Sequence, residues 1–219
     1  MARLRFRPAL KAAPWLAPLA ALASGCGRDL PLDILVQDTW TGLELDAVDQ
    51  AIAEWNSVAG SRLRQPGPVL VNAGQTADAF DQDDLGDERH VIYRISEPTP
   101  EFKELESQIG EMLGYGTYGD VLIVTYMMPL PWFCAEESFL RMKPDEDYQE
   151  YLDGIKPEEF REECVKRLRA LVLHELGHFI GLAHYQNEPA IMNTETRDPN
   201  VTHLTEVDIE SFCVAYDCR

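Results

Sequence analysis

The residues from His174 to His184, with the sequence HELGHFIGLAH, constrain this chain more than any other stretch. Residues four apart lie on the same face of a helix, so His174 and His178 can direct two imidazole rings at one point. Glu175 follows the first of these histidines, where its carboxylate can reach a water molecule held at that point and act as general base. The spacing therefore predicts two metal ligands and a catalytic carboxylate on one helix.

Gly181 and His184 complete the pattern. Glycine tolerates the positive φ that often ends a helix, so the chain can turn back at Gly181 and present His184 as a third ligand from outside the helix. Three nitrogen ligands leave one position of a zinc ion open for water, which distinguishes a catalytic site from a closed structural one. We therefore expect a zinc ion on His174, His178 and His184, and hydrolysis as the chemistry.

The run matches HExxHxxGxxH at every specified position, and in this the chain resembles the metzincin zinc metallopeptidases. Metzincins also carry a methionine turn beneath the metal, and the resemblance implies that Met192, at the end of Pro-Ala-Ile-Met, occupies it. Gly177 and Leu182 inside the motif, and a closing helix that begins near Leu204, make the chain most like the matrixin branch. The resemblance implies a metalloendopeptidase that acts on protein or peptide substrates.

An alternative to an enzyme is a catalytically inactive, zinc-containing surface lipoprotein with a binding or scaffolding role. The presence of Glu175 argues against this alternative, because metal binding alone does not need that carboxylate. A digest of casein or a peptide library with and without a chelator would separate the two.

Several residues depart from the patterns of the individual metzincin branches. Tyr185 stands where matrixins usually carry Ser or Thr, and Asn193 and Thr194 follow the methionine without the proline usual in matrixins. Position 194 also lacks the tyrosine that astacin-like and serralysin-like relatives bring near the metal. Archaemetzincins place paired cysteines just after the third histidine, whereas Cys213 and Cys218 come later. The branch within the metzincins stays open.

The first 26 residues have the composition of an export signal. Four basic residues precede an apolar run, at about 12–23, that is too short to span a bilayer. The run ends in Ala-Ser-Gly-Cys, which resembles the bacterial lipobox and implies acylation of Cys26 and a membrane anchor. A plain secretory signal cut near the same place is the alternative. We expect an exported protein, either a lipoprotein on the periplasmic or outer cell surface or a secreted protein.

The sequence is strongly acidic, with 38 acidic against 19 basic residues. Without the first 26 residues, 15 basic residues remain and the net charge is −23. This charge would repel nucleic acid and anionic headgroups, so we expect no nucleic-acid partner and membrane attachment through the lipid alone. The acidic stretch 78–88, with Asp81, Asp83 and Asp84, is a candidate calcium loop, although a lone acidic loop is usually only solvated.

The chain contains five cysteines, of which Cys26 belongs to the lipobox. The even number that remains in an exported chain predicts two disulfides among Cys134, Cys164, Cys213 and Cys218. Of the three possible pairings, proximity in the sequence favours Cys134 with Cys164 and Cys213 with Cys218.

The organisation that we expect is a lipoprotein-type signal peptide (1–26), a short tether (27–32) and one zinc metallopeptidase domain (33–219), as a monomer without an N-terminal prodomain. Hydrophobic periodicity predicts strands at 34–36, 69–71, 91–95 and 121–127. It predicts helices at 46–59, with Asp46 as N-cap, from 99 onward, from 157 through the metal ligands, and after a Thr205–Asp208 capping pair. Tyr115 and Tyr118 lie between glycines, which favours an ordinary turn over a role in lining the substrate cleft.

With the metzincin resemblance, these elements imply an α+β fold. We expect a twisted mixed β-sheet packed on two long helices, with a C-terminal helix after the methionine turn.

Overall fold

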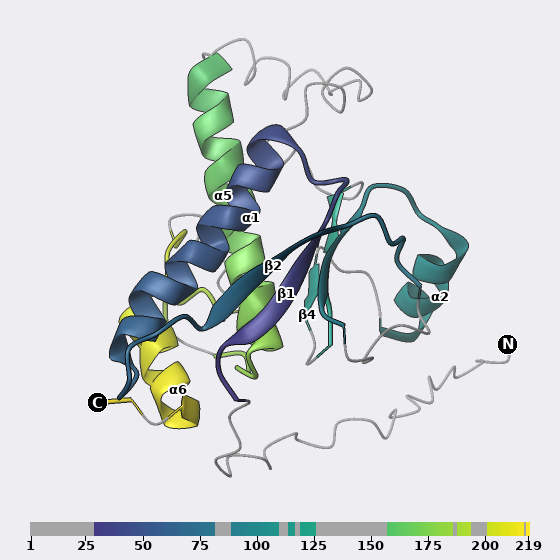
Figure 1. The fold of residues 1–219 in the computed structure, drawn as a ribbon. Coiled ribbons are helices and arrows are strands. Elements are labelled where there is room, and N and C mark those ends of the chain that lie inside the picture. The colour runs from purple at the N-terminus through teal and green to yellow at the C-terminus, as the bar shows by residue number, and fades with distance from the viewer. Residues whose placement is uncertain are drawn as a thin grey trace, which may run out of the picture.

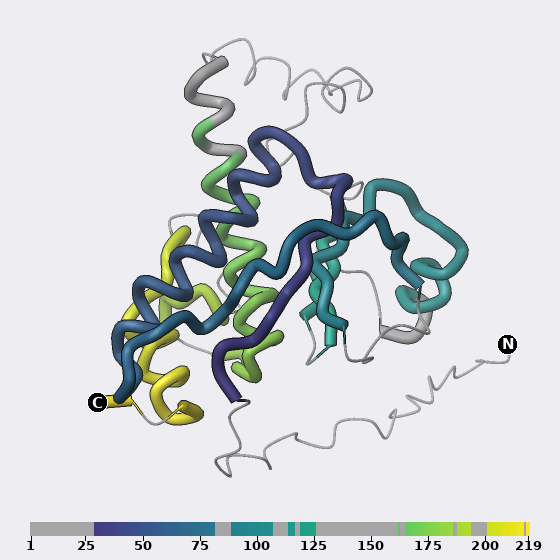
Figure 2. The backbone as a smooth tube through the Cα atoms, viewed as in Figure 1, coloured from purple at the N-terminus to yellow at the C-terminus, as the bar shows by residue number. Residues whose placement is uncertain are grey.

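The computed structural model describes residues 29–81, 89–109, 114–116, 119–125, 157–185, 188–193, 201–216 and 218–219, and the structural statements below concern these residues. The strands are β1 (Leu32–Gln37), β2 (Leu70–Thr76), β3 (Val91–Ile95), β4 (Gly114–Gly116) and β5 (Val121–Val124). The α-helices are α1 (Gly42–Glu54), α2 (Pro100–Ile109), α5 (Pro157–Phe179) and α6 (Glu206–Tyr216). Figure 1 shows their arrangement, and Figure 2 follows the backbone in the same view.

The five strands form one mixed sheet in the order β2-β1-β3-β5-β4. The first four in this order pair in parallel, whereas β4 runs antiparallel to β5 and forms an edge of the sheet. Parallel neighbours need long connections between them, and helices fill such connections here, with α1 between β1 and β2 and α2 between β3 and β5.

Side chains that alternate along β3 and β5 divide the core into two clusters, one on each face of the sheet. Ile92, Val121 and Ile123 belong to the larger cluster, which also contains the buried residues of α1, α5 and α6. Tyr93, Leu122 and Val124 belong to the smaller cluster, which α2 covers with Phe102 and Leu105. Helices α1 and α5 pack against each other on their face of the sheet, and α6 lies at their lower end (Figure 1).

This architecture confirms the predicted α+β fold, with a mixed sheet on two long helices and a C-terminal helix. Within the described part of the chain, no helix is both long and apolar enough to cross a bilayer.

The predicted start of α1 at Asp46 is wrong by one turn. The helix begins at Gly42, after Thr41 as N-cap, and continues through a π-helical turn at Trp55–Ala59. The early start buries Glu44, whose carboxylate lies 2.8 Å from Nε of Arg94 in β3. This partner is remote in the sequence, so local periodicity could not reveal the first turn of the helix.

Three strands also have other ends than predicted. Strand β1 runs from Leu32 to Gln37, beyond the predicted range 34–36, and its first residue falls in the expected tether. Strand β2 runs to Thr76 because it continues to pair with Gln37 of β1 beyond its short apolar run. Strand β5 ends at Val124, and the last two residues of its predicted range lie outside the described residues.

Of the two predicted disulfides, the one between Cys213 and Cys218 is present, with Cα atoms 4.8 Å apart. Cys26 and Cys134 lie outside the described residues, as does the side chain of Cys164. The same holds for Asp83 and Asp84 of the acidic loop and for Tyr118.

Candidate metal centre

Helix α5 carries His174, Glu175 and His178 in its last turns. The helix ends in a Schellman arrangement, in which Gly181 N donates to the carbonyl of His178 and Leu182 N to that of Gly177. Gly181 has a φ of 93°, a left-handed conformation that only glycine adopts easily. The chain therefore turns back as its sequence predicts, and it brings His184 over the helix.

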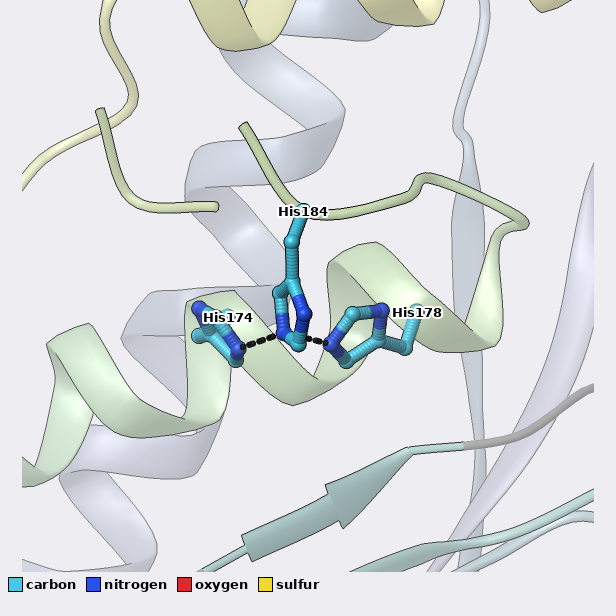
Figure 3. Close-up of side chains that lie close together, drawn as sticks. All are labelled: His174, His178 and His184. Atoms are coloured by element: carbon cyan, nitrogen blue, oxygen red, sulfur yellow. Dashed lines mark hydrogen bonds between the residues drawn. The ribbon is translucent and has the colours of Figure 1, made fainter. Parts of the chain in front are cut away.

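The three histidines direct their Nε2 atoms at one point (Figure 3). Nε2 of His184 lies 3.1 Å from Nε2 of His174 and 2.8 Å from Nε2 of His178. The ligand atoms of the three residues all lie within 4.8 Å of one another. These separations are close to the roughly 3.4 Å expected between nitrogens about 2.1 Å from a tetrahedral zinc ion.

The protons on these rings can be inferred from their backbone partners. Nδ1 of His174 lies 2.7 Å from the carbonyl oxygen of Ile191, and Nδ1 of His178 lies 2.9 Å from that of Leu182. A carbonyl oxygen only accepts hydrogen bonds, so both Nδ1 atoms carry the proton, and each neutral ring presents an Nε2 lone pair to the centre. Converging lone pairs repel one another unless a cation lies between them, and three imidazole nitrogens suit zinc.

The side chains of the site differ in their exposure to solvent. His174 and Glu175 are buried, at 6% and 3% exposure, His178 is half-buried and His184 is exposed. Burial lowers the pKa of His178, although the hydrogen bond to the carbonyl of Leu182 acts in the opposite direction. A lowered pKa favours the neutral imidazole, which is the form that binds metal.

Met192 lies against the helix that carries the ligands, at Gly177 of the motif. A Cβ atom at Gly177 would overlap Sδ of Met192, so the glycine makes room for the methionine. Met192 is fully buried, and its neighbour Ile191 provides the carbonyl that binds His174. The loop expected to form the methionine turn therefore packs under the histidines and also orients one of them.

Asp208 of α6 anchors this loop, a role that the sequence did not reveal. The expected capping pair is present, with Thr205 Oγ1 donating to Asp208 Oδ2 over 2.8 Å. The same carboxylate accepts hydrogen bonds of 3.0 Å from the backbone N–H groups of Ile191 and Met192. The TxxD pattern signalled the cap, but nothing local in the sequence pointed to a second pair of donors.

Gly114 and Gly116 of β4 also have a role that the sequence did not reveal. A Cβ atom at Gly114 would lie 2.5 Å from Oε1 of Glu175, and one at Gly116 would overlap the backbone oxygen of Glu175. These glycines let the edge strand lie directly on the helix, beside the expected general base. Tyr115 between them pairs with Leu122 of β5, so the expectation of an ordinary turn is wrong because this segment is a strand.

Tyr185 and Asn193, which depart from the matrixin pattern, lie next to each other and form a short parallel bridge. The backbone N–H of Tyr185 donates to the carbonyl of Met192 over 3.0 Å. The Tyr185 hydroxyl is buried without a hydrogen-bond partner among the described residues. Burial and the charge of Asp208 raise the pKa of Tyr185 to about 12. The tyrosine therefore stays neutral and supports the loop that carries Met192.

The chain has counterparts among protein families and solved structures. Residues 121–217, which contain the histidine motif, Met192 and α6, match the peptidase family model Matrixin. Among solved structures, the chain is similar to archaemetzincin from Methanopyrus kandleri, with 16% identity, a TM-score of 0.39, and coverage of 82% of this chain and 92% of that chain. No curated protein matches the chain.

The predicted resemblance to the matrixins is confirmed over residues 121–217 by the family match. With the three-histidine site, this match indicates a zinc metallopeptidase.

Proposed function

We propose that this matrixin-like chain is a zinc-dependent endopeptidase. The observation that carries the proposal is the convergence of three imidazole Nε2 atoms beside a buried glutamate. The hydrogen bonds of His174 and His178 to backbone carbonyls hold both rings in the ligand tautomer before any metal binds. Such preorganisation is typical of a resident metal site.

In this proposal His174, His178 and His184 would hold the zinc ion. Three protein ligands would leave one coordination position for water. When bound, zinc supplies Lewis acidity, which lowers the pKa of water to about 7 and polarises the scissile carbonyl. Glu175 accepts the proton of the attacking water and later passes it to the leaving amine.

The substrate side of the proposal rests on β4. Among the described strands, β4 pairs only with β5, and it lies beside Glu175, so a polypeptide in extended form can bind along the edge with its backbone near the base. Protein or peptide substrates follow from this geometry and from the peptidase family that the chain matches.

The test is a digest of casein and of a mixed peptide library by the purified protein. We expect cleavage that stops when a chelator removes the metal and returns when zinc is added. Cleavage that a chelator does not affect would refute the metal mechanism. Stoichiometric zinc without any cleavage would instead favour the binding or scaffolding role.

We further propose that the peptidase works outside the cytoplasm, attached through lipid at Cys26. The support is the basic and apolar segment at the start of the chain and the lipobox-like residues with which this segment ends. Expression of the full chain in a bacterium should place it in the membrane fraction, and a Cys26→Ser variant should lose this location. A full-length variant chain that stays in the membrane fraction would contradict the lipid anchor.

A further inference from the structure

We propose that Tyr216 is a positioning residue for His184, and that the Cys213–Cys218 disulfide holds Tyr216 in place. The inference rests on the proposed function in one respect, namely that His184 is a zinc ligand. It concerns a contact between the C-terminal end of α6 and the end of α5, away from the metal.

The contact is a hydrogen bond of 2.6 Å from the Tyr216 hydroxyl to the carbonyl oxygen of Ile180. The last carbonyls of a helix have no partner within the helix, and Tyr216 satisfies this one. Ile180 directly precedes Gly181, so the bond fixes the peptide unit from which the chain turns toward His184. Three residues separate Ile180, whose carbonyl is bonded, from His184, the third ligand.

The ring of His174 is held from another part of the fold. It is held by the carbonyl of Ile191, and that loop is anchored by Asp208 near the start of α6. His184 reaches the site only through the turn that begins at Ile180. Loss of the Tyr216 hydroxyl should therefore weaken the contribution of His184 far more than that of His174.

An aromatic cluster holds the Tyr216 ring in position. The ring stacks on Phe212 with centroids 4.7 Å apart, and Phe212, which is fully buried, contacts Trp55. Trp55 in turn donates from Nε1 to the carbonyl of Leu173, over 3.2 Å. Trp55 and Tyr216 of this cluster therefore donate hydrogen bonds to carbonyls on either side of the segment that carries His174 and His178.

The disulfide closes a loop around Tyr216, because it joins the residues three before and two after it. Backbone contacts hold the end of this loop against the segment at Arg62 and Leu63. Cys218 forms an antiparallel β-bridge with Leu63, and the N–H of Arg219 donates to the carbonyl of Arg62. The cross-link therefore limits the movement of Tyr216 away from Ile180.

The test measures zinc affinity by competition with a chromophoric chelator, so it does not depend on catalysis. We expect Tyr216→Phe, which keeps the stacked ring, to raise the zinc Kd about tenfold, the lower end of the usual effect of groups that orient ligands. The double variant Cys213→Ser/Cys218→Ser should raise it about threefold. Val214→Ala is the matched control, because Val214 lies in the same disulfide loop with 80% exposure, and it should leave the Kd unchanged.

A merely structural role for Tyr216 is tested in two further backgrounds. The tenfold effect of Tyr216→Phe should persist in a His174→Ala protein but fall below threefold in a His184→Ala protein, where the group that it positions is absent. An equal effect in both backgrounds would overturn the inference. So would an unchanged Kd in Tyr216→Phe while the wild type binds zinc, which would leave the proposed peptidase intact. A wild type that binds no zinc would overturn both proposals.

Discussion

Individual contacts around Glu175 decide whether this site can perform the proposed chemistry. The carboxylate lies between the helix backbone and a strand whose glycines leave no side chain in the space. A general base must be held within hydrogen-bond reach of its water, and displacement by about 1 Å can cost about a hundredfold in rate. The proposed chemistry therefore needs Gly114 as much as it needs the histidines.

Gly114→Ala should lower kcat/KM by roughly 10- to 100-fold while zinc content stays unchanged, because the new methyl group would lie 2.5 Å from Oε1 of Glu175. Hydrolysis of a fluorogenic peptide and metal analysis of the same sample measure the two effects. Gly67→Ala is the control, since a Cβ atom there would meet only the backbone oxygen of Gln65, at 3.8 Å. Full activity in Gly114→Ala would show that the strand does not constrain the base.

The sequence predicted the residues whose roles depend on local spacing. The histidines, Glu175 and Gly181 follow helical geometry, and the resemblance pointed to Met192. It could not predict Gly114 or Asp208, because their partners lie far along the chain and no periodicity links them. A glycine within a strand indicates that another part of the protein or a ligand approaches the backbone closely, but only the fold shows what approaches it.

At the scale of elements, α6 supports the site from the far side of the methionine loop. Its Asp208 carboxylate is fully buried and accepts bonds from the N–H groups of Ile191, Met192 and Thr205. The position of the loop thus depends on a helix that lies later in the sequence. The loop in turn orients His174 through the carbonyl of Ile191.

Asp208→Ala should lower the free energy of unfolding by about 3 kcal/mol, because it leaves buried N–H groups without acceptors. It should also weaken zinc binding, through the loosened loop. Chemical denaturation and chelator competition measure these effects, with Glu210→Ala as the control because Glu210 is exposed on the same helix. If Asp208→Ala and Glu210→Ala were equally stable, α6 would not anchor the loop.

Element positions followed from the sequence where a short apolar run is buried almost throughout, as in β3, whose predicted and observed bounds agree. The predicted bounds were wrong where contacts with distant residues extend a helix or strand. The first turn of α1 gains an ion pair with Arg94, and β2 gains polar residues that pair with β1. Both extensions involve partners on other strands.

At the scale of the whole molecule, the site joins regions that are distant in the chain. Helix α5, the loop at Met192 and the edge strand β4 meet at the histidines, and α6 anchors that loop. A ligand that bridges the helix and the following turn should therefore stabilise the whole fold, because it binds the folded chain and not the unfolded one.

Zinc at 100 times its Kd should add about 2.7 kcal/mol to the free energy of unfolding. Thermal unfolding with and without zinc, in a metal-free buffer, measures the shift. His178→Ala is the matched variant, and its response to the same zinc concentration should be much smaller. An equal response in both proteins would mean that zinc binds elsewhere.

The proposed role of Glu175 as general base is tested by comparing Glu175→Gln with the wild type for zinc content and peptide hydrolysis in the same preparations. We expect equimolar zinc in both proteins and a kcat lower by about 1,000-fold in the variant, because the amide cannot accept the proton of the attacking water. Undiminished hydrolysis in a zinc-loaded variant would contradict it.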